Sequence, residues 1–207
     1  MRSVQLLSSG LRRVAAASVG SVRTATIRLG ATCPAIAESA FVAPSADLIG
    51  DVRIHEDVSV WYQCVLRGDV APIQVGARSN IQDGTIVHAA SAELNGTPRG
   101  TIIGEDVTVG HGAVLHACTL QDRCFVGMRA VVMDRAVVET GAMVAAGALV
   151  GTDKVVKSGE LWAGVPAKKL RNLTEAEAAF IEKSAAQYVD FGIWHKCQGK
   201  TLSRFPP

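Results

Sequence analysis

The sequence predicts an all-β fold, a parallel β-helix built from hexapeptide repeats and followed by one C-terminal α-helix. Two observations carry this prediction. Aliphatic residues recur every six positions through the middle of the chain, and the hydrophobic share of 48% goes with only 5% aromatic residues. A core of small aliphatic side chains suits short strands stacked at a regular spacing better than an aromatic-centred globule.

The six-residue period covers eighteen positions with three interruptions, and these frame residues are Val42, Leu48, Ile54, Val60, Leu66, Val75, Ile81, Val87, Ile103, Val109, Leu115, Leu120, Val126, Val132, Val138, Val144, Val150 and Val156. A period of six fits neither an amphipathic helix nor the alternation of an ordinary strand. In hexapeptide repeats each six residues form a strand and a turn, and three of them complete one triangular coil. The coil is expected to be left-handed, as in known hexapeptide families.

Residues 1–30 form the first predicted segment. They are rich in Arg, Ser and Ala, contain no acidic residue, and place Leu7, Leu11 and Val14 at helical spacing. This composition is typical of a mitochondrial transit peptide. The alternative is an N-terminal extension that is retained, either flexible or lying as an amphipathic tail on a membrane surface.

Residues 40–165 form the predicted β-helix. The repeat is interrupted at 67–74 and 88–102, which we expect to be loops that leave the prism. Glycine directly follows several of the frame residues, where a turn or close packing between coils is expected. These positions are Gly76, Gly104, Gly110 and Gly127.

Residues 172–192 form the predicted C-terminal helix, and residues 193–207 a tail. Thr174 and Glu177 make a capping box, and Ile181, Ala185 and Tyr188 supply an apolar face. The helix is expected to lie along the prism and cover part of its surface.

Charge and cysteine content exclude some classes of function. The formal charge of +2 includes five arginines that precede Glu38, so the remainder carries −3. No basic stripe follows, so nucleic acid is not an expected partner. The five cysteines never form C-x-x-C, which indicates buried thiols in a reducing compartment and argues against a disulfide framework or a thiolate metal cluster.

Three of the five histidines lie in two short stretches, NIQDGTIVHAA and VTVGHGAVLHAC. His88 and His116 each follow a frame residue by one, and one full coil separates them, so we expect them to stack on one outer edge. His111 belongs to the preceding side and is expected to face away from that pair. In a threefold-symmetric trimer, the His111 of a neighbour could complete the set. His55 and His195 have no partner in register.

Three imidazoles plus one water form the usual catalytic zinc arrangement. Zinc lowers the pKa of its water from about 15.7 to about 7, which generates hydroxide at neutral pH. Hydroxide is the nucleophile that carbon dioxide requires. The alternative is a set of exposed or interfacial histidines without metal.

Five stretches of the chain resemble γ-class carbonic anhydrases: VWYQCVLRGD, RSNIQDGTIVH, TIIGEDVTVGHGAVLHAC, FVGMRAVVMD and MVAAGALV. The resemblance covers residues 40–190, and it is especially to the mitochondrial members on the membrane arm of respiratory complex I in plants and many protists. It implies reversible hydration of carbon dioxide to bicarbonate by a metal-bound hydroxide at a subunit interface. It also implies a homotrimer, or a heterotrimer with paralogues, in the mitochondrial matrix and peripheral on the inner membrane.

The resemblance implies that His88, His111 and His116 are the zinc ligands, with His111 donated by the adjacent subunit. Three histidines also accept iron or cobalt, so the identity of the metal stays open.

The resemblance also implies a catalytic set around the metal. Arg67 and Asp69 would pair across the subunit interface, and Gln82, with Asn80 nearby, would orient the hydroxide and bicarbonate. An interface salt bridge without a catalytic part is the alternative for Arg67 and Asp69. Asp83 either supports the metal ligands or is a turn residue.

Several residues depart from the family pattern. Val70 stands where active members carry a proton-shuttling glutamate, so proton transfer would depend on buffer, a water chain, or Glu93 if its loop folds over the site. Arg129 and Arg135 replace common glycines, and so does Gln63. These three substitutions predict modestly altered turns and a surface shaped for a partner.

Two other functions remain open at this point. The chain could be a weakly active or inactive structural or assembly subunit of complex I, which Val70 favours. It could also be a hexapeptide acyltransferase, since the same solenoid and the phrase AGVPAKKL occur in that class.

Overall fold

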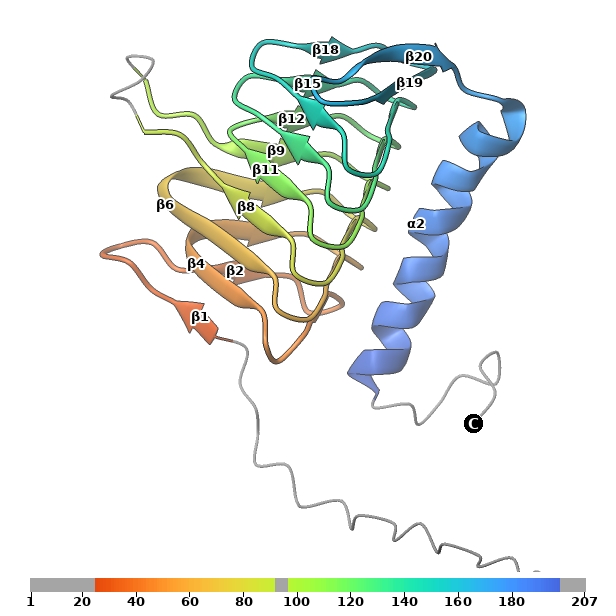
Figure 1. Cartoon of the computed structure of the whole chain (residues 1–207). Coiled ribbons are helices and arrows are strands. Elements are labelled where there is room, and N and C mark those ends of the chain that lie inside the picture. The colour runs from red at the N-terminus through yellow and green to blue at the C-terminus, as the bar shows by residue number, and fades with distance from the viewer. Residues whose placement is uncertain (1–24, 92–96, 198–207) are drawn as a thin grey trace, which may run out of the picture.

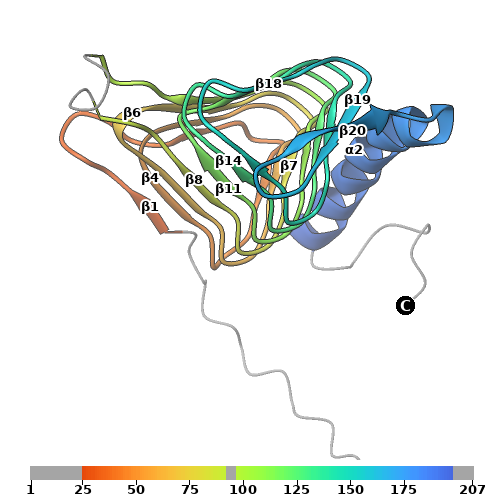
Figure 2. The same ribbon diagram turned by 45° about the horizontal axis from the view of Figure 1, so that its top comes forward.

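The computed structural model describes residues 25–91 and 97–197. The predicted transit segment up to residue 24 lies outside the described residues, as do Glu93 in the second interruption and residues 198–207 of the predicted tail. Within the described chain, short strands wind into a triangular prism flanked by a single helix (Figure 1; Figure 2). The parallel β-helix predicted from the six-residue period is thereby confirmed.

The elements in chain order are β1 (Ala25–Ile27), β2 (Ala35–Ile36), β3 (Phe41–Val42), β4 (Asp47–Ile54), β5 (Ser59–Val60), β6 (Val65–Val75), β7 (Asn80–Ile81), β8 (Ile86–His88), β9 (Thr101–Ile103), β10 (Thr108–Val109), β11 (Val114–His116), β12 (Thr119–Leu120), β13 (Phe125–Val126), β14 (Val131–Val132), β15 (Val137–Val138), β16 (Met143–Val144), β17 (Leu149–Val150), β18 (Val155–Val156), β19 (Glu160–Ala163), β20 (Lys168–Asn172) and α2 (Glu175–Lys196).

The strands form three sides of the prism. The first side contains β8, β11, β14 and β17, the second contains β9, β12, β15 and β18, and the third runs from β3 to β19 and ends in the antiparallel strand β20. The long strands β4 and β6 belong to both the first and the second side and join them into one sheet. The expectation of a loop at 67–74 was wrong, because the segment lies within β6: its two ends pair with β4, β8 and β9, and the register of the pairing with β4 shifts between them.

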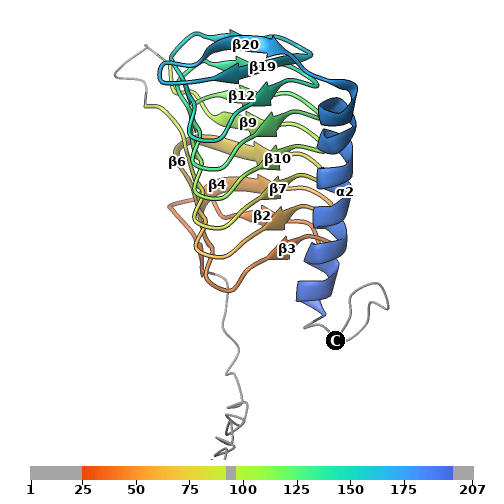
Figure 3. The same cartoon turned by 45° about the vertical axis from the view of Figure 1, so that its right-hand side comes forward.

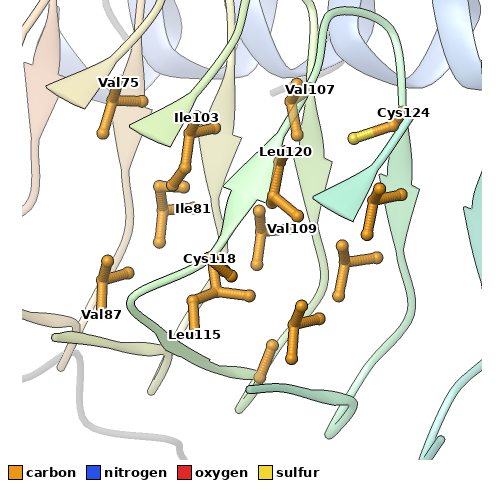
Figure 4. Close-up of a cluster of buried hydrophobic side chains, with 14 of the residues drawn as sticks. Val75, Ile81, Val87, Ile103, Val107, Val109, Leu115, Cys118, Leu120 and Cys124 are labelled. Atoms are coloured by element: carbon orange, nitrogen blue, oxygen red, sulfur yellow. The ribbon is translucent and has the colours of Figure 1, made fainter. Parts of the chain in front are cut away.

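Each hexad has two inward positions. The frame residues other than Val42 are buried, and the residue two before each of them is usually small and also buried. Cys64, Cys118 and Cys124 occupy this second position, and the latter two lie among the stacked aliphatics in Figure 4. Burial raises the pKa of the Cys118 thiol to about 12 and that of Cys64 to about 11. These thiols therefore pack as small hydrophobic groups.

The turns between sides repeat one backbone conformation. Gln63, Arg129 and Arg135 have φ values of 59°, 56° and 58°, the left-handed region that glycine adopts most easily. The expectation of altered turns at these positions was therefore wrong, because the side chains accept the glycine-like geometry. The predicted close approaches are confirmed at all four glycines, since an added Cβ would lie 2.4 to 2.8 Å from the backbone of the next coil.

Helix α2 lies along the third side of the prism (Figure 3). It begins with the predicted capping box, in which Thr174 and Glu177 each bond the backbone of the other. The helix starts three residues later than the predicted first residue, 172, and ends four residues after the predicted last residue, 192. No helix in the described part of the chain has the length and hydropathy of a membrane span.

Candidate metal centre

One outer edge of the first side carries Arg67, His88 and His116 side by side. Strands β6, β8 and β11 pair in parallel, with Arg67 opposite His88 and His88 opposite His116. The two imidazole centroids lie 5.2 Å apart, and their side chains are 20% and 30% exposed. The stacking expected from the repeat is therefore present, and the backbone ladder fixes it.

Asp69 connects His88 to Arg67. Its Oδ1 lies 2.9 Å from His88 Nε2, and its Oδ2 accepts a hydrogen bond from the Arg67 guanidinium. Burial alone would raise the pKa of the Asp69 carboxyl, but the hydrogen bonds from His88 and Arg67 outweigh it and lower the pKa below its ordinary value. Arg67, Asp69 and His88 thus form one group within a single chain.

Asp134 lies beside the second histidine of the edge. Its Oδ2 is 3.1 Å from His116 Nδ1, and its side chain is only 14% exposed. This distance is short enough for a hydrogen bond. His116 Nδ1 is nevertheless buried without one, because the angle between the two groups is unfavourable.

His111 lies at the opposite corner of the first side, in the turn between β10 and β11. Its Nδ1 is 2.8 Å from Asp83 Oδ2, and its side chain is 46% exposed. The other carboxylate oxygen of Asp83 accepts the backbone N–H of Tyr62 at 3.2 Å. Asp83 is therefore held in place on the coil below His111.

His111 cannot join the other two histidines within one chain. His111 lies in the turn that precedes β11 and His116 is the last residue of that strand, so the two side chains belong to opposite ends of this side. A zinc–nitrogen bond is only about 2 Å long. In residues 25–91 and 97–197, no three His, Cys, Asp or Glu side chains come close enough together to hold a metal.

The donor set nevertheless suits a metal such as zinc. Each of the three histidines faces one aspartate, at distances of 2.9, 2.8 and 3.1 Å. Histidines that bind metal usually donate their second ring N–H to a carboxylate, which fixes the tautomer and the ring orientation. Cobalt and iron accept the same donors.

Asn80 and Gln82 lie near His111 and away from the stacked pair. Both are buried, and the amide nitrogen of Gln82 donates to Asn80 Oδ1 at 3.2 Å. Gln82 and His111 line a cavity of about 520 Å³ between the third side and α2, whose other walls include Phe125, Met128 and Phe191. The predicted site residues thus fall into two groups at opposite corners of the first side.

The remaining histidines belong to neither group. His55 lies 3.9 Å from Glu56 on the exposed surface. His195 packs against Trp61 with ring centroids 4.8 Å apart, and its Nδ1 lies 3.0 Å from the Tyr62 hydroxyl. Val70 follows Asp69 and is 40% exposed, as expected for a side chain at the edge of the site.

No sequence motif assigned a role to Asp134 or Ser184. Asp134 follows the frame residue Val132 by two, and Val132 pairs with Leu115 one coil earlier, so this position could have placed Asp134 near His116. Ser184 is a buried polar residue within an apolar helix face, and its contact with Thr108 comes from a strand 76 residues earlier. No pattern in the sequence predicts that contact.

Comparison with known proteins identifies similar chains. No protein-family model matches the chain. It is 51% identical over 165 residues to gamma carbonic anhydrase 1, mitochondrial, from Arabidopsis thaliana, covering 80% of this chain but only 60% of that protein. It is 40% identical to a carbonic anhydrase from Geobacillus kaustophilus, covering 79% of this chain and 86% of that one.

A solved structure is also similar over most of its length. The hexapeptide transferase family protein from Anaplasma phagocytophilum has 47% sequence identity and a TM-score of 0.75, with 82% of this chain and 96% of that chain covered.

Proposed function

This chain belongs to the γ-class carbonic anhydrase family, and we propose that it catalyses the reversible hydration of carbon dioxide to bicarbonate. One observation carries the proposal: His88 and His116 lie at one corner of the first side and His111 lies at the opposite corner, each beside an aspartate. Two of them stack on one edge and the third lies too far away, so a complete site requires two copies. The metal would be held by His88 and His116 of one subunit and His111 of the next.

The surface of the first side supports association between copies. Outward-facing aliphatic residues from neighbouring strands stand in register along it, and Ile86 among them is 46% exposed. These residues are Val65, Ile86, Val114, Val131 and Leu149. An apolar ladder that connects the two half-sites is a suitable surface for a second copy. A closed threefold trimer would use both corners of every subunit.

The residues around each half-site have defined roles in this proposal. Bound zinc supplies Lewis acidity, which makes water acidic enough to provide a nucleophile at neutral pH. Gln82 orients that nucleophile through its side-chain amide, and Arg67 offsets the charge of bicarbonate. The cavity beside His111 has largely apolar walls, which suit the uncharged substrate.

Val70 favours a second candidate function. A valine next to Asp69 cannot relay protons, so regeneration of the nucleophile would depend on buffer or water. We therefore keep as the alternative a slow or inactive subunit with a structural or assembly role on the membrane arm of complex I. In that case the chain could share its trimer with paralogues, and some sites would lose a ligand.

The mitochondrial names of the Arabidopsis relatives support a mitochondrial location. We propose the matrix, with a peripheral position on the inner membrane, in agreement with the composition of residues 1–30.

Oxygen-18 exchange from labelled bicarbonate, measured with metal analysis on the purified assembly, tests the proposal. We expect exchange above the buffer rate and bound metal, both lost in His88→Ala and both kept in the control His55→Ala. Bound metal without exchange would leave only the structural role. Absence of metal together with acetyl transfer from acetyl-CoA would instead support the transferase activity named for the Anaplasma protein.

A further inference from the structure

Four arginines occupy left-handed positions at the corners of the prism, with φ between 51° and 59°: Arg78, Arg123, Arg129 and Arg135. Residues other than glycine adopt this conformation only at a cost. Arg78 and Arg135 offset the cost with ion pairs to carboxylates on the adjacent coil. Within residues 25–91 and 97–197, Arg123 and Arg129 form no side-chain hydrogen bond or ion pair. Their guanidinium groups are available for a further contact.

Arg129 lies one coil after His111, at the same corner of the first side. Its backbone N–H donates to the His111 carbonyl oxygen at 2.8 Å. Its side chain passes over Gly112, where an added Cβ would lie 3.5 Å from Arg129 Cγ, and Arg129 is exposed. The corner that carries His111 therefore presents a guanidinium that no carboxylate of the described chain neutralises.

Asp134 has the matching position at the opposite corner. It follows Val132, and Val132 pairs with Leu115, the residue before His116, so Asp134 lies one coil after His116. Its Oδ2 lies 3.1 Å from His116 Nδ1, and the carboxylate forms no ion pair with a lysine or arginine of the described chain. A partly buried carboxylate without a cationic partner favours the approach of one.

A small hollow of about 180 Å³ borders Asp134, and Arg99 and Arg135 line it as well. Arg135 bonds Asp153 through two N–H groups, so its charge is already offset. Arg99 contributes no ion pair within the described residues. Arg99 is therefore the competing partner for Asp134 inside the same chain, and an experiment must separate it from Arg129.

A threefold ring brings the two matching positions together. His111 and His116 belong to the same coil, because one precedes β11 and the other ends it. Rotation about an axis parallel to the prism leaves the height of every residue along that axis unchanged. When His111 of one subunit meets His116 of the next, the following coils also meet, about 4.8 Å further along. Arg129 of the first subunit then lies level with Asp134 of the second.

We propose that Arg129 of the subunit that supplies His111 forms an ion pair with Asp134 of the subunit that supplies His116. This inference rests on the proposed function, in which two subunits complete each metal site. A guanidinium that bonds Asp134 Oδ1 leaves Oδ2 for His116 Nδ1. The pair thereby holds the carboxylate that orients one metal ligand, and it forms only when the subunits associate.

Coupling with a carbodiimide, which joins an amine and a carboxylate that are already in contact, tests the pair directly. Arg129→Lys supplies the amine at this position. In the purified assembly of this variant, we expect cross-linked dimers and trimers above the wild-type background on denaturing gels. Mass spectrometry should locate the bond between positions 129 and 134. The double variant Arg129→Lys with Asp134→Asn should lose these products.

Arg123→Lys is the matched control, because Arg123 has the same backbone conformation and no partner but lies at a different corner of the prism. It should give no cross-links beyond the wild-type background. Dissociation of the metal-loaded assembly on dilution is the second measurement. Arg129→Gln should raise the protein concentration of half-dissociation about fivefold, as for the loss of a partly exposed ion pair, and Arg123→Gln should not change it. Sedimentation velocity measures this shift.

A trimer in which Arg129→Lys gives no more cross-links than Arg123→Lys would overturn the inference and leave the shared metal site intact. Weaker metal binding in Arg99→Gln, with unchanged binding and association in Arg129→Gln, would also overturn it, because Asp134 would then pair within its own chain. A trimer that cross-links between positions 129 and 134 but has no hydration activity would support the ion pair and contradict the proposed function.

Discussion

Each candidate metal ligand has its own carboxylate partner, although the three histidines lie on different strands and turns. Asp69 faces His88, Asp83 faces His111 and Asp134 faces His116. A carboxylate beside one ring nitrogen favours the tautomer that leaves the other nitrogen free to bind a metal. The three pairs therefore prepare both corners of the first side for the same chemistry.

Asp134 provides the sharpest test at the scale of single residues. Asp134→Asn keeps the side-chain volume but removes the charge beside His116, and it should weaken metal binding about 10- to 100-fold. Competition with a chelator measures this loss. Asp153→Asn is the control, because Asp153 is on the next coil and pairs with Arg135. Equal metal affinity in Asp134→Asn and the wild-type protein would contradict the assigned role.

At the scale of elements, most hexads combine a strand of two or three residues with a turn in the left-handed region, whereas β4 and β6 are longer. Large aliphatic frame residues alternate with small ones at the second inward position, so neighbouring coils fill the prism without aromatic side chains. Arg135 offsets the cost of its turn conformation with a two-pronged bond to Asp153 on the adjacent coil. The repeat thus tolerates non-glycine residues at several corners.

The start of α2 depends on one carboxylate. Glu177 bonds Arg171 of β20 through both oxygens, at 2.7 and 2.8 Å, and also accepts the backbone N–H of Thr174. Arg171 and then Thr174 lower the pKa of Glu177 to about 2. Since the folded pKa lies below the ordinary value, the stabilisation is complete above about pH 4.5 and is lost as the pH falls toward 2.

Thermal unfolding measured by circular dichroism across this pH window tests the role of Glu177. Glu177→Gln should have a lower Tm than the wild-type protein at pH 7, and the difference should shrink between pH 4.5 and pH 2. Glu175→Gln, in the same first turn, is the control. A Tm difference that stays constant over this range would show that the Arg171 and Thr174 contacts do not stabilise the fold.

At the scale of the whole molecule, the two half-sites lie at opposite corners of one side. Mixed assemblies of two inactive variants test whether neighbours complete each other. In trimers formed by His88→Ala and His111→Ala subunits, about a quarter of the sites would receive an intact set of ligands under random association. Oxygen-18 exchange by doubly tagged, co-expressed protein should recover to that level.

The control for this experiment is co-expression of His88→Ala with His116→Ala. Both ligands come from the same subunit, so no combination restores a site and the exchange rate should stay at the buffer level. Recovery in this control, or no recovery in the first mixture, would contradict the division of ligands between subunits.

The sequence by itself determined the coil, its inward frame residues and the stacking of His88 on His116. A period of six residues leaves one regular solution for the backbone, and the parallel ladder then carries every residue to a fixed place on the prism. The capping box at Thr174 and Glu177 was equally local. These features depend on neighbours within one hexad, one coil or one helical turn.

The tertiary structure alone decided the continuity of β6 through residues 67–74, the contact between Asp134 and His116, and the bond between Ser184 and Thr108. Each depends on side chains or strands that meet because separate coils, or the helix and the prism, come together in space. The six-residue period predicts which face of the prism a residue occupies. It does not predict the rotamer of the side chain or the residues that the side chain contacts. Contacts of this kind are set by packing between elements, which no local pattern encodes.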